Sequence, residues 1–270
     1  MKRWLFREPP AGSPPRGLAR ELSISPLLLD ILWRRGLDSP EELDAYLSAR
    51  LPDLVPPSRW PQFPQAAEVI SKALLDGKKL AVWGDYDVDG ITSSTLVLDV
   101  LEAHGLEALW HVPDRRSEGY GLNIPAIEEL AAQGCGILLT VDCGISDMAA
   151  VARARELGMT VVISDHHLPP PELPPADAIC NPRLGPEDDM PCPHLAGVGV
   201  AFFLMAAVNA ALAPHTGRRF KMDKVLDLVA LGTLADVMRL GGQNRILVRG
   251  GLDKLAEAAR PGIAALKTVS

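Results

Sequence analysis

The chain has 270 residues, enough for one large domain or two small ones with a sizeable hydrophobic core. Hydrophobic residues make up 47% and charged residues 23% of the sequence, which is typical of a soluble globular protein. The N-terminus has no apolar stretch of signal-peptide length, and no apolar run reaches the ~18 residues of a membrane span, so we expect a cytoplasmic protein with no membrane partner.

The net charge of −7 argues on its own against a nucleic-acid partner. The sum is a weak guide, however, because carboxylates that bind cations count as negative although the bound ions offset them. The four cysteines contain no Cys-x-x-Cys pair, so we expect reduced thiols and no zinc ribbon. Cys192 close to His194 leaves a structural zinc site as an alternative.

The first 64 residues are predicted to form a small helical extension that ends in a proline-rich linker. Residues 1–24 have an irregular, proline-rich pattern. Two short helices are predicted next, because a capping serine twice precedes a proline at the first helical position: Ser25 before Pro26, and Ser39 before Pro40. Residues 51–64 contain several prolines and are expected to connect this extension to the rest of the chain.

From about residue 65 the pattern alternates between helices and short apolar strands. Strands are predicted at residues 80–83, 108–112, 137–141 and 160–163, with helices near 91–104, 124–133 and 146–157. This alternation implies an α/β fold, a parallel sheet with helices on both faces. A mostly helical segment is expected to follow, at 197–213, 222–235 and 245–258. We therefore divide the chain into an extension over residues 1–64 and an α/β domain over residues 65–270.

Acidic residues follow three of the predicted strands. The first strand is followed by Asp85, Asp87 and Asp89, the third by Asp142, and the fourth by residues 165–167, which read Asp-His-His. In open parallel sheets, ligands bind at the carboxyl ends of the strands. Carboxylates crowded there repel one another unless cations neutralise them. The pattern predicts two Mn²⁺ or Mg²⁺ ions ~3.5–4 Å apart, an arrangement suited to phosphoryl transfer.

Each acidic group also has a simpler interpretation. The Asp-x-Asp-x-Asp-Gly pattern resembles the start of an EF-hand loop, and Gly90 fits its sixth position. Leu96, however, stands where an EF-hand requires Glu, and the pattern follows a strand. Asp142 alone fits an ordinary strand end, and residues 165–167 alone fit a turn. Chance is a poor explanation for all three in this order after successive strands.

Taken together, these motifs resemble those of the DHH phosphoesterase family. Asp85, Asp87 and Asp89 match its first motif, Asp142 its second, and residues 165–167 the motif that gives the family its name. Residues 231–237 match the fourth motif and contribute Asp236. The four motifs occur in the family's order and cover roughly residues 80–240.

Within that family, the chain is most similar to the RecJ branch of single-stranded-DNA exonucleases. Residues 84–90 read Gly-Asp-Tyr-Asp-Val-Asp-Gly, whereas the pyrophosphatase and oligonucleotidase branches usually carry a histidine before a shorter Asp-x-Asp. Similar stretches lie at 118–122, 195–201, 243–245 and 250–252, and around Trp4. The resemblance implies 5′–3′ hydrolysis of single-stranded DNA in repair and recombination. The alternatives are an oligonucleotidase, a cyclic-dinucleotide phosphodiesterase or pyrophosphatase of the same family, or a non-catalytic replication scaffold, although scaffolds typically lose metal ligands.

The resemblance also implies the site residues. One ion would take Asp89, Asp142, His166 and Asp236, and the other Asp85, Asp87 and Asp142, so that Asp142 bridges them. The catalytic residues would include Asp142 and His166. His167 would face the scissile phosphate and stabilise the charge that develops on it. Asp165 would orient its neighbours.

DNA contacts are expected from Arg115, Arg116, Arg245 and Tyr120, and the alternatives are solvated surface arginines and a structural turn tyrosine. RecJ proteins continue with a DHH-associated domain and an OB-like domain beyond the region matched here. We therefore expect this chain to be a catalytic fragment that binds Mn²⁺ and degrades DNA weakly or not at all. A single-strand-binding protein or a helicase as partner cannot be read from the sequence.

Overall fold

The computed structural model describes residue 8 and residues 12–186 and 190–269, and the chain divides into two compact units, Met1–Arg50 and Leu51–Ser270. We expected the division at residue 64. Residues 51–64 instead belong to the second unit, because Trp60 and Phe63 stack on each other and pack with Phe203 in its core. The backbone N–H of Val55 also donates a hydrogen bond to Gln243 Oε1 over 2.9 Å.

In the part of the N-terminal unit that the structure describes, there are three short helices, α1 (Leu18–Glu21), α2 (Pro26–Arg34) and α3 (Pro40–Ser48). Both predicted caps are confirmed: the Ser25 hydroxyl accepts a hydrogen bond from the Leu28 N–H, and Ser39 accepts one from the Glu42 N–H. A small core of leucines around Trp33 holds the helices together. Helix α1 was not predicted, and Trp4 lies outside the described residues.

The second unit is built on a five-stranded parallel sheet in the order β2-β1-β3-β4-β5. Its strands are β1 (Lys79–Gly84), β2 (Ala108–His111), β3 (Cys135–Val141), β4 (Thr160–Ser164) and β5 (Ala178–Cys180). The parallel sheet and the first four strands are confirmed. The three-residue β5 was too short to predict. Because the chain runs outward in opposite directions from β1 and β3, these neighbours mark the point where a ligand crevice forms in such sheets.

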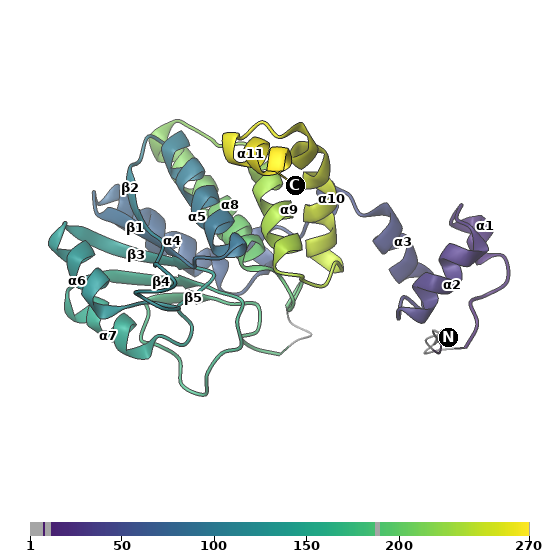
Figure 1. Ribbon diagram of the computed structural model, residues 1–270, viewed down its shortest axis with the longest axis horizontal. Helices are drawn as coiled ribbons and strands as arrows, with labels where there is room; N and C mark the ends of the chain where they lie inside the picture. Colours follow the sequence, from purple (N-terminus) through teal and green to yellow (C-terminus); the bar gives the residue numbers. More distant parts are fainter. Residues whose placement is uncertain (1–7, 9–11, 187–189, 270) are drawn as a thin grey trace. The chain divides into compact units, whose positions relative to one another are not determined.

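Helices cover both faces of the sheet, as expected (Figure 1). One face packs against α6 (Ile124–Ala132) and α7 (Met148–Glu156), through residues such as Ile127 and Val151. The other face packs against α4 (Phe63–Leu75), α5 (Val88–Ala103) and α8 (Gly197–Thr216). The bounds of the remaining elements are η1 (Leu51–Asp53), η2 (Pro57–Arg59), η4 (Met222–Val225), α9 (Leu226–Ala235), α10 (Gly242–Glu257) and α11 (Pro261–Val269). Helices α4 and α11 were not predicted, and the helix expected at 222–235 is divided into η4 and α9.

Helix α8 corrects one expectation. Among the described residues it is long and apolar enough, by length and composition, to cross a membrane, so the statement that no apolar run reaches that length is wrong. In this fold, 67% of its most apolar window is buried, and the helix packs against α4 and α5. Burial in the core therefore explains its apolar composition.

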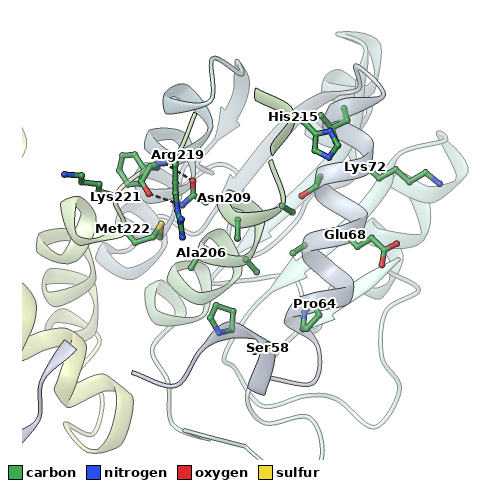
Figure 2. A pocket seen from close by; sticks show the side chains of 18 of the residues that line it. Ser58, Pro64, Glu68, Lys72, Ala206, Asn209, His215, Arg219, Lys221 and Met222 are labelled. Carbon is green, nitrogen blue, oxygen red and sulfur yellow. Dashed lines mark hydrogen bonds between the residues drawn. The ribbon is translucent and has the colours of Figure 1, made fainter. Parts of the chain in front are cut away.

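A groove of about 1220 Å³ lies between α4 and the second half of α8. Figure 2 shows Lys72, Glu68 and His215 among the polar residues at its edge. Alanines from both helices form much of its apolar lining. None of the residues that line it belongs to the predicted metal site, so this groove and the strand-end chemistry are separate features.

Trp60→Ala should lower the free energy of unfolding by about 3–5 kcal/mol, because it leaves a large cavity beside Phe63 and Phe203. Trp110→Ala is the matched control: Trp110 is 64% exposed, whereas Trp60 is 0% exposed. The measurement is urea unfolding followed by circular dichroism. Equal losses in the two variants would show that residues 51–64 do not belong to the core of the second unit.

Candidate metal centre

Asp85 and Asp142 lie at the carboxyl ends of the neighbouring strands β1 and β3, where the strand order reverses. His166 follows β4, the next strand in the sheet. Two further carboxylates lie on helices or next to them: Asp89 lies in the first turn of α5, and Asp236 is the C-cap residue directly after α9. The site is therefore formed by segments that are far apart in sequence.

The loop after β1 turns tightly into α5. Asp87 caps this helix, and its Oδ1 accepts a hydrogen bond from the Gly90 N–H over 2.9 Å. A Cβ atom at Gly90 would lie 2.4 Å from the Asp85 carbonyl oxygen, so only glycine allows the first turn of α5 to approach the strand end this closely. The Asp-x-Asp-x-Asp-Gly motif thus joins a strand to a helix and is not an EF-hand loop.

The backbone of Asp142 adopts an unusual conformation. Its φ is +61°, in the left-handed region that non-glycine residues rarely occupy. The Asp142 N–H donates a hydrogen bond to the Ser164 carbonyl over 2.9 Å, which continues the pairing of β3 with β4. Strained backbone of this kind persists where the surroundings enforce it and is concentrated at functional sites.

The side chains converge on His166 and Asp142. His166 Nε2 lies 3.1 Å from Asp142 Oδ1, 3.7 Å from Asp236 Oδ2 and 3.9 Å from Asp89 Oδ2. The possible ligand atoms of Asp89, His166 and Asp236 lie within 4.8 Å of one another, as do those of Asp85, Asp87 and Asp142. All the residues predicted as metal ligands therefore come together, in two groups that adjoin at Asp142.

The donor atoms of this centre suit divalent cations. Asp85 Oδ1 and Asp142 Oδ1 are buried and have no hydrogen-bond partner among the described residues. Burial raises the pKa of Asp142 well above its ordinary value, and the neighbouring charges of Asp89 and Asp87 raise it further. Burial likewise raises the pKa of Asp89. Buried carboxylate oxygens without partners fit the oxygen coordination of Mn²⁺ and Mg²⁺.

Asp165 differs from these carboxylates because both of its oxygens are engaged. Oδ1 accepts hydrogen bonds from the His166 N–H over 2.7 Å and from His167 Nδ1 over 2.7 Å, and Oδ2 accepts one from the Ile145 N–H over 3.0 Å. Burial would raise the pKa of Asp165, but its interactions with His167 and the backbone N–H groups lower it below the ordinary value. In turn, the hydrogen bond to Asp165 raises the pKa of His167 to about 9.

Tyr120 packs edge-on against His167, and its hydroxyl oxygen lies 3.4 Å from His167 Nδ1. The ring of Tyr86 lies edge-on to Tyr120, and the Arg115 guanidinium lies 5.2 Å from the centre of the Tyr86 ring. A series of aromatic rings thus runs from His167 to Arg115. Tyr86 was missed by the sequence analysis, although its place between Asp85 and Asp87 was the available signal.

Two of the arginines predicted to contact DNA lie in different environments. Arg116 is exposed on the loop that carries Arg115, and Arg245 is half-buried in the first turn of α10. Their DNA contacts stay predictions.

The four cysteines are free and buried, and the groups of possible metal ligands among the described residues contain no cysteine. The alternative of a zinc site at Cys192 therefore has no structural support within those residues.

Comparison with known proteins relates this geometry to characterised relatives. The chain is 35% identical to the single-stranded-DNA-specific exonuclease RecJ of Bacillus subtilis over 99% of its own length and 33% of the relative. It is 39% identical to Escherichia coli RecJ, over 92% of this chain and 43% of that one. The crystal structure of Thermus thermophilus RecJ in complex with Mn²⁺ matches with a TM-score of 0.74 and 30% identity, over 94% of this chain and 35% of that one.

The chain therefore spans less than half the length of these relatives. The family described as "DHH family, N-terminal domain" matches residues 79–233, which is more than half of the sequence. This stretch contains the sheet and most of the residues that converge on Asp142. From this match, together with the geometry of the metal centre, we conclude that the chain belongs to the DHH family.

Proposed function

We propose that the chain is the catalytic part of a metal-dependent exonuclease that hydrolyses single-stranded DNA from the 5′ end, in DNA repair and recombination. The observation that carries this proposal is the pair of ligand groups that adjoin at Asp142. The likeness to RecJ exonucleases, one of them in complex with Mn²⁺, supports both the substrate and the metal. The proposed location is the cytoplasm, and the proposed cofactors are two Mn²⁺ or Mg²⁺ ions.

When bound, the ions supply Lewis-acid activation of the phosphoryl group and of the attacking water. Asp142 would contribute to both ions, with His166, Asp89 and Asp236 on one side and Asp85 and Asp87 on the other. These carboxylates and the imidazole are held by strand ends and helix termini, so the ligand side chains are already close together before an ion binds.

His167 would act on the substrate. Asp165 holds its ring through the 2.7 Å hydrogen bond, which also raises the pKa of His167 in the metal-free chain. An imidazole N–H that is partly exposed beside the ligands can donate to a phosphate oxygen as negative charge develops there. Tyr120 and Tyr86 offer aromatic surfaces for a base, and Arg115 offers a cation for a phosphate.

Substrate choice tests this proposal against other activities of the family. With Mn²⁺, we expect release of mononucleotides from a long 5′-phosphorylated strand, at a rate below that of a full-length relative, and slower hydrolysis of a dinucleotide and of pyrophosphate. Asp142→Ala and a chelator serve as controls and should each abolish the reaction. Faster hydrolysis of the dinucleotide, or of pyrophosphate, would favour the corresponding alternative. No hydrolysis of any substrate by a chain that binds Mn²⁺ would favour a scaffold.

Asp142→Ala should weaken binding of both ions by more than about 100-fold, because Asp142 belongs to one ligand group and its Oδ1 lies 3.1 Å from His166 of the other. Even outer partners of metal ligands contribute about 10–100-fold. Asp236→Ala is the matched control and should weaken only one ion, since Asp236 belongs to one group. The measurement is titration with Mn²⁺ followed by calorimetry. A single site lost in Asp142→Ala would show that Asp142 does not bridge the ions.

In the metal-free chain, we expect His167 to titrate near pH 9, above its ordinary value of 6.5, because Asp165 stabilises the imidazolium. The contribution of this pair to folding stability is fully present below pH 6.5 and is lost as the pH rises through about 9. NMR titration of the ring protons, assigned with His167→Gln, measures the pKa. In Asp165→Asn it should fall toward 6.5, and an unchanged value would contradict this account.

A further inference from the structure

Helix α8 begins directly against the metal centre. The N–H groups of Gly197 and Val198 donate hydrogen bonds of 2.8 Å to Asp89, one to each carboxylate oxygen. The residue before the helix, Ala196, offers no side-chain cap, so Asp89 of α5 caps α8 from outside the helix. A Cβ atom at Gly197 would lie 2.5 Å from Asp142 Oδ1, so only glycine lets α8 start this close.

Asn244, at the start of α10, holds this first turn of α8 in place. Its side chain is fully buried, and its Oδ1 accepts a hydrogen bond from the Ala196 N–H over 3.2 Å. Its Nδ2 donates to the carbonyl of His194 over 2.7 Å and to that of Arg239 over 3.2 Å. One amide therefore ties the segment before α8 to the turn that follows Asp236.

We propose that Asn244 is a positioning residue for the ion held by Asp89, His166 and Asp236. It acts on Asp89 through the backbone of Ala196, Gly197 and Val198, and on Asp236 through the turn that ends at Arg239. The inference rests on the proposed function insofar as this group binds an ion.

Loss of the Asn244 amide would leave the buried Ala196 N–H without its acceptor and would take a donor from the part-buried carbonyls of His194 and Arg239. The start of α8 would then shift to satisfy these groups. The first two N–H groups of α8 hold the Asp89 carboxylate, so this carboxylate would shift with the helix. The group of Asp85, Asp87 and Asp142 depends on none of these hydrogen bonds.

Asn209 provides a matched control on the same helix. It is also a buried asparagine, and it also holds backbone groups, because its Oδ1 accepts a hydrogen bond from the Phe220 N–H and its Nδ2 donates to the Phe220 carbonyl. It lies in the second half of α8, beside the groove with α4 and not at the metal centre. Asn209→Ala and Asn244→Ala should therefore both lower the urea midpoint of unfolding.

Metal affinity separates the two variants. In a titration with Mn²⁺ alone, followed by electron paramagnetic resonance of the free ion, Asn244→Ala should weaken one site by about 10–100-fold, as loss of outer partners of metal ligands does. The second site should keep its affinity, and Asn209→Ala should leave both sites unchanged. If Asn244→Ala does not fold, Asn244→Ser, which keeps a hydroxyl able to make one of the hydrogen bonds, should show a smaller loss at the same site.

Each remaining outcome has a definite meaning. Wild-type affinity for both ions in a folded Asn244 variant would overturn the inference and leave the proposed function intact. An equal loss of affinity in Asn209→Ala would also overturn it, because the effect would then be general destabilisation. Absence of Mn²⁺ binding by the wild-type chain would overturn the proposed function, and this inference with it.

Discussion

Electrostatic repulsion among buried carboxylates is the constraint on which the rest of this structure depends. Asp85, Asp89 and Asp142 are nearly inaccessible to solvent and lie within a few ångströms of like charges. Such an arrangement is unfavourable unless cations, hydrogen-bond donors or protons compensate it. The fold supplies donors for some of this charge, through the N-terminus of α8 on Asp89 and the backbone N–H groups on Asp165. The oxygens left without partners are the ones suited to metal ions.

The same constraint explains why the pKa values of two buried carboxylates, Asp165 and Asp142, are shifted in opposite directions. Asp165 is as buried as Asp142, yet its pKa is lowered while that of Asp142 is raised. The difference lies in the partners. Asp165 accepts hydrogen bonds from His167 and from backbone N–H groups, whereas the charges of Asp89 and Asp87 add to burial in raising the pKa of Asp142. Asp165 therefore holds the ring of His167, whereas Asp142 keeps a buried oxygen that has no hydrogen-bond partner among the described residues.

Much of this could be predicted from the sequence, because the informative patterns were local. Apolar runs that end in aspartate located β1, β3 and β4, and parallel strands bring their carboxyl ends to one edge. What the sequence did not reveal depends on tertiary contacts. Residues 51–64 belong to the second unit because Trp60 is buried in its core. The contacts of Asn244 and Tyr86 are with residues distant along the chain. Strand β5 consists of only three residues, which are held by their pairing with β4.

The order of the ligands along the chain has a consequence for biosynthesis. Asp85, Asp87 and Asp142 leave the ribosome well before helix α8, Asn244 and Asp236 have been made. A nascent chain can therefore hold one complete set of acidic ligands while the other lacks both its last carboxylate and the helix start that orients Asp89. Since two-ion chemistry requires both sets, the proposed site would be complete only once helices α8, α9 and α10 have folded onto the rest of the unit.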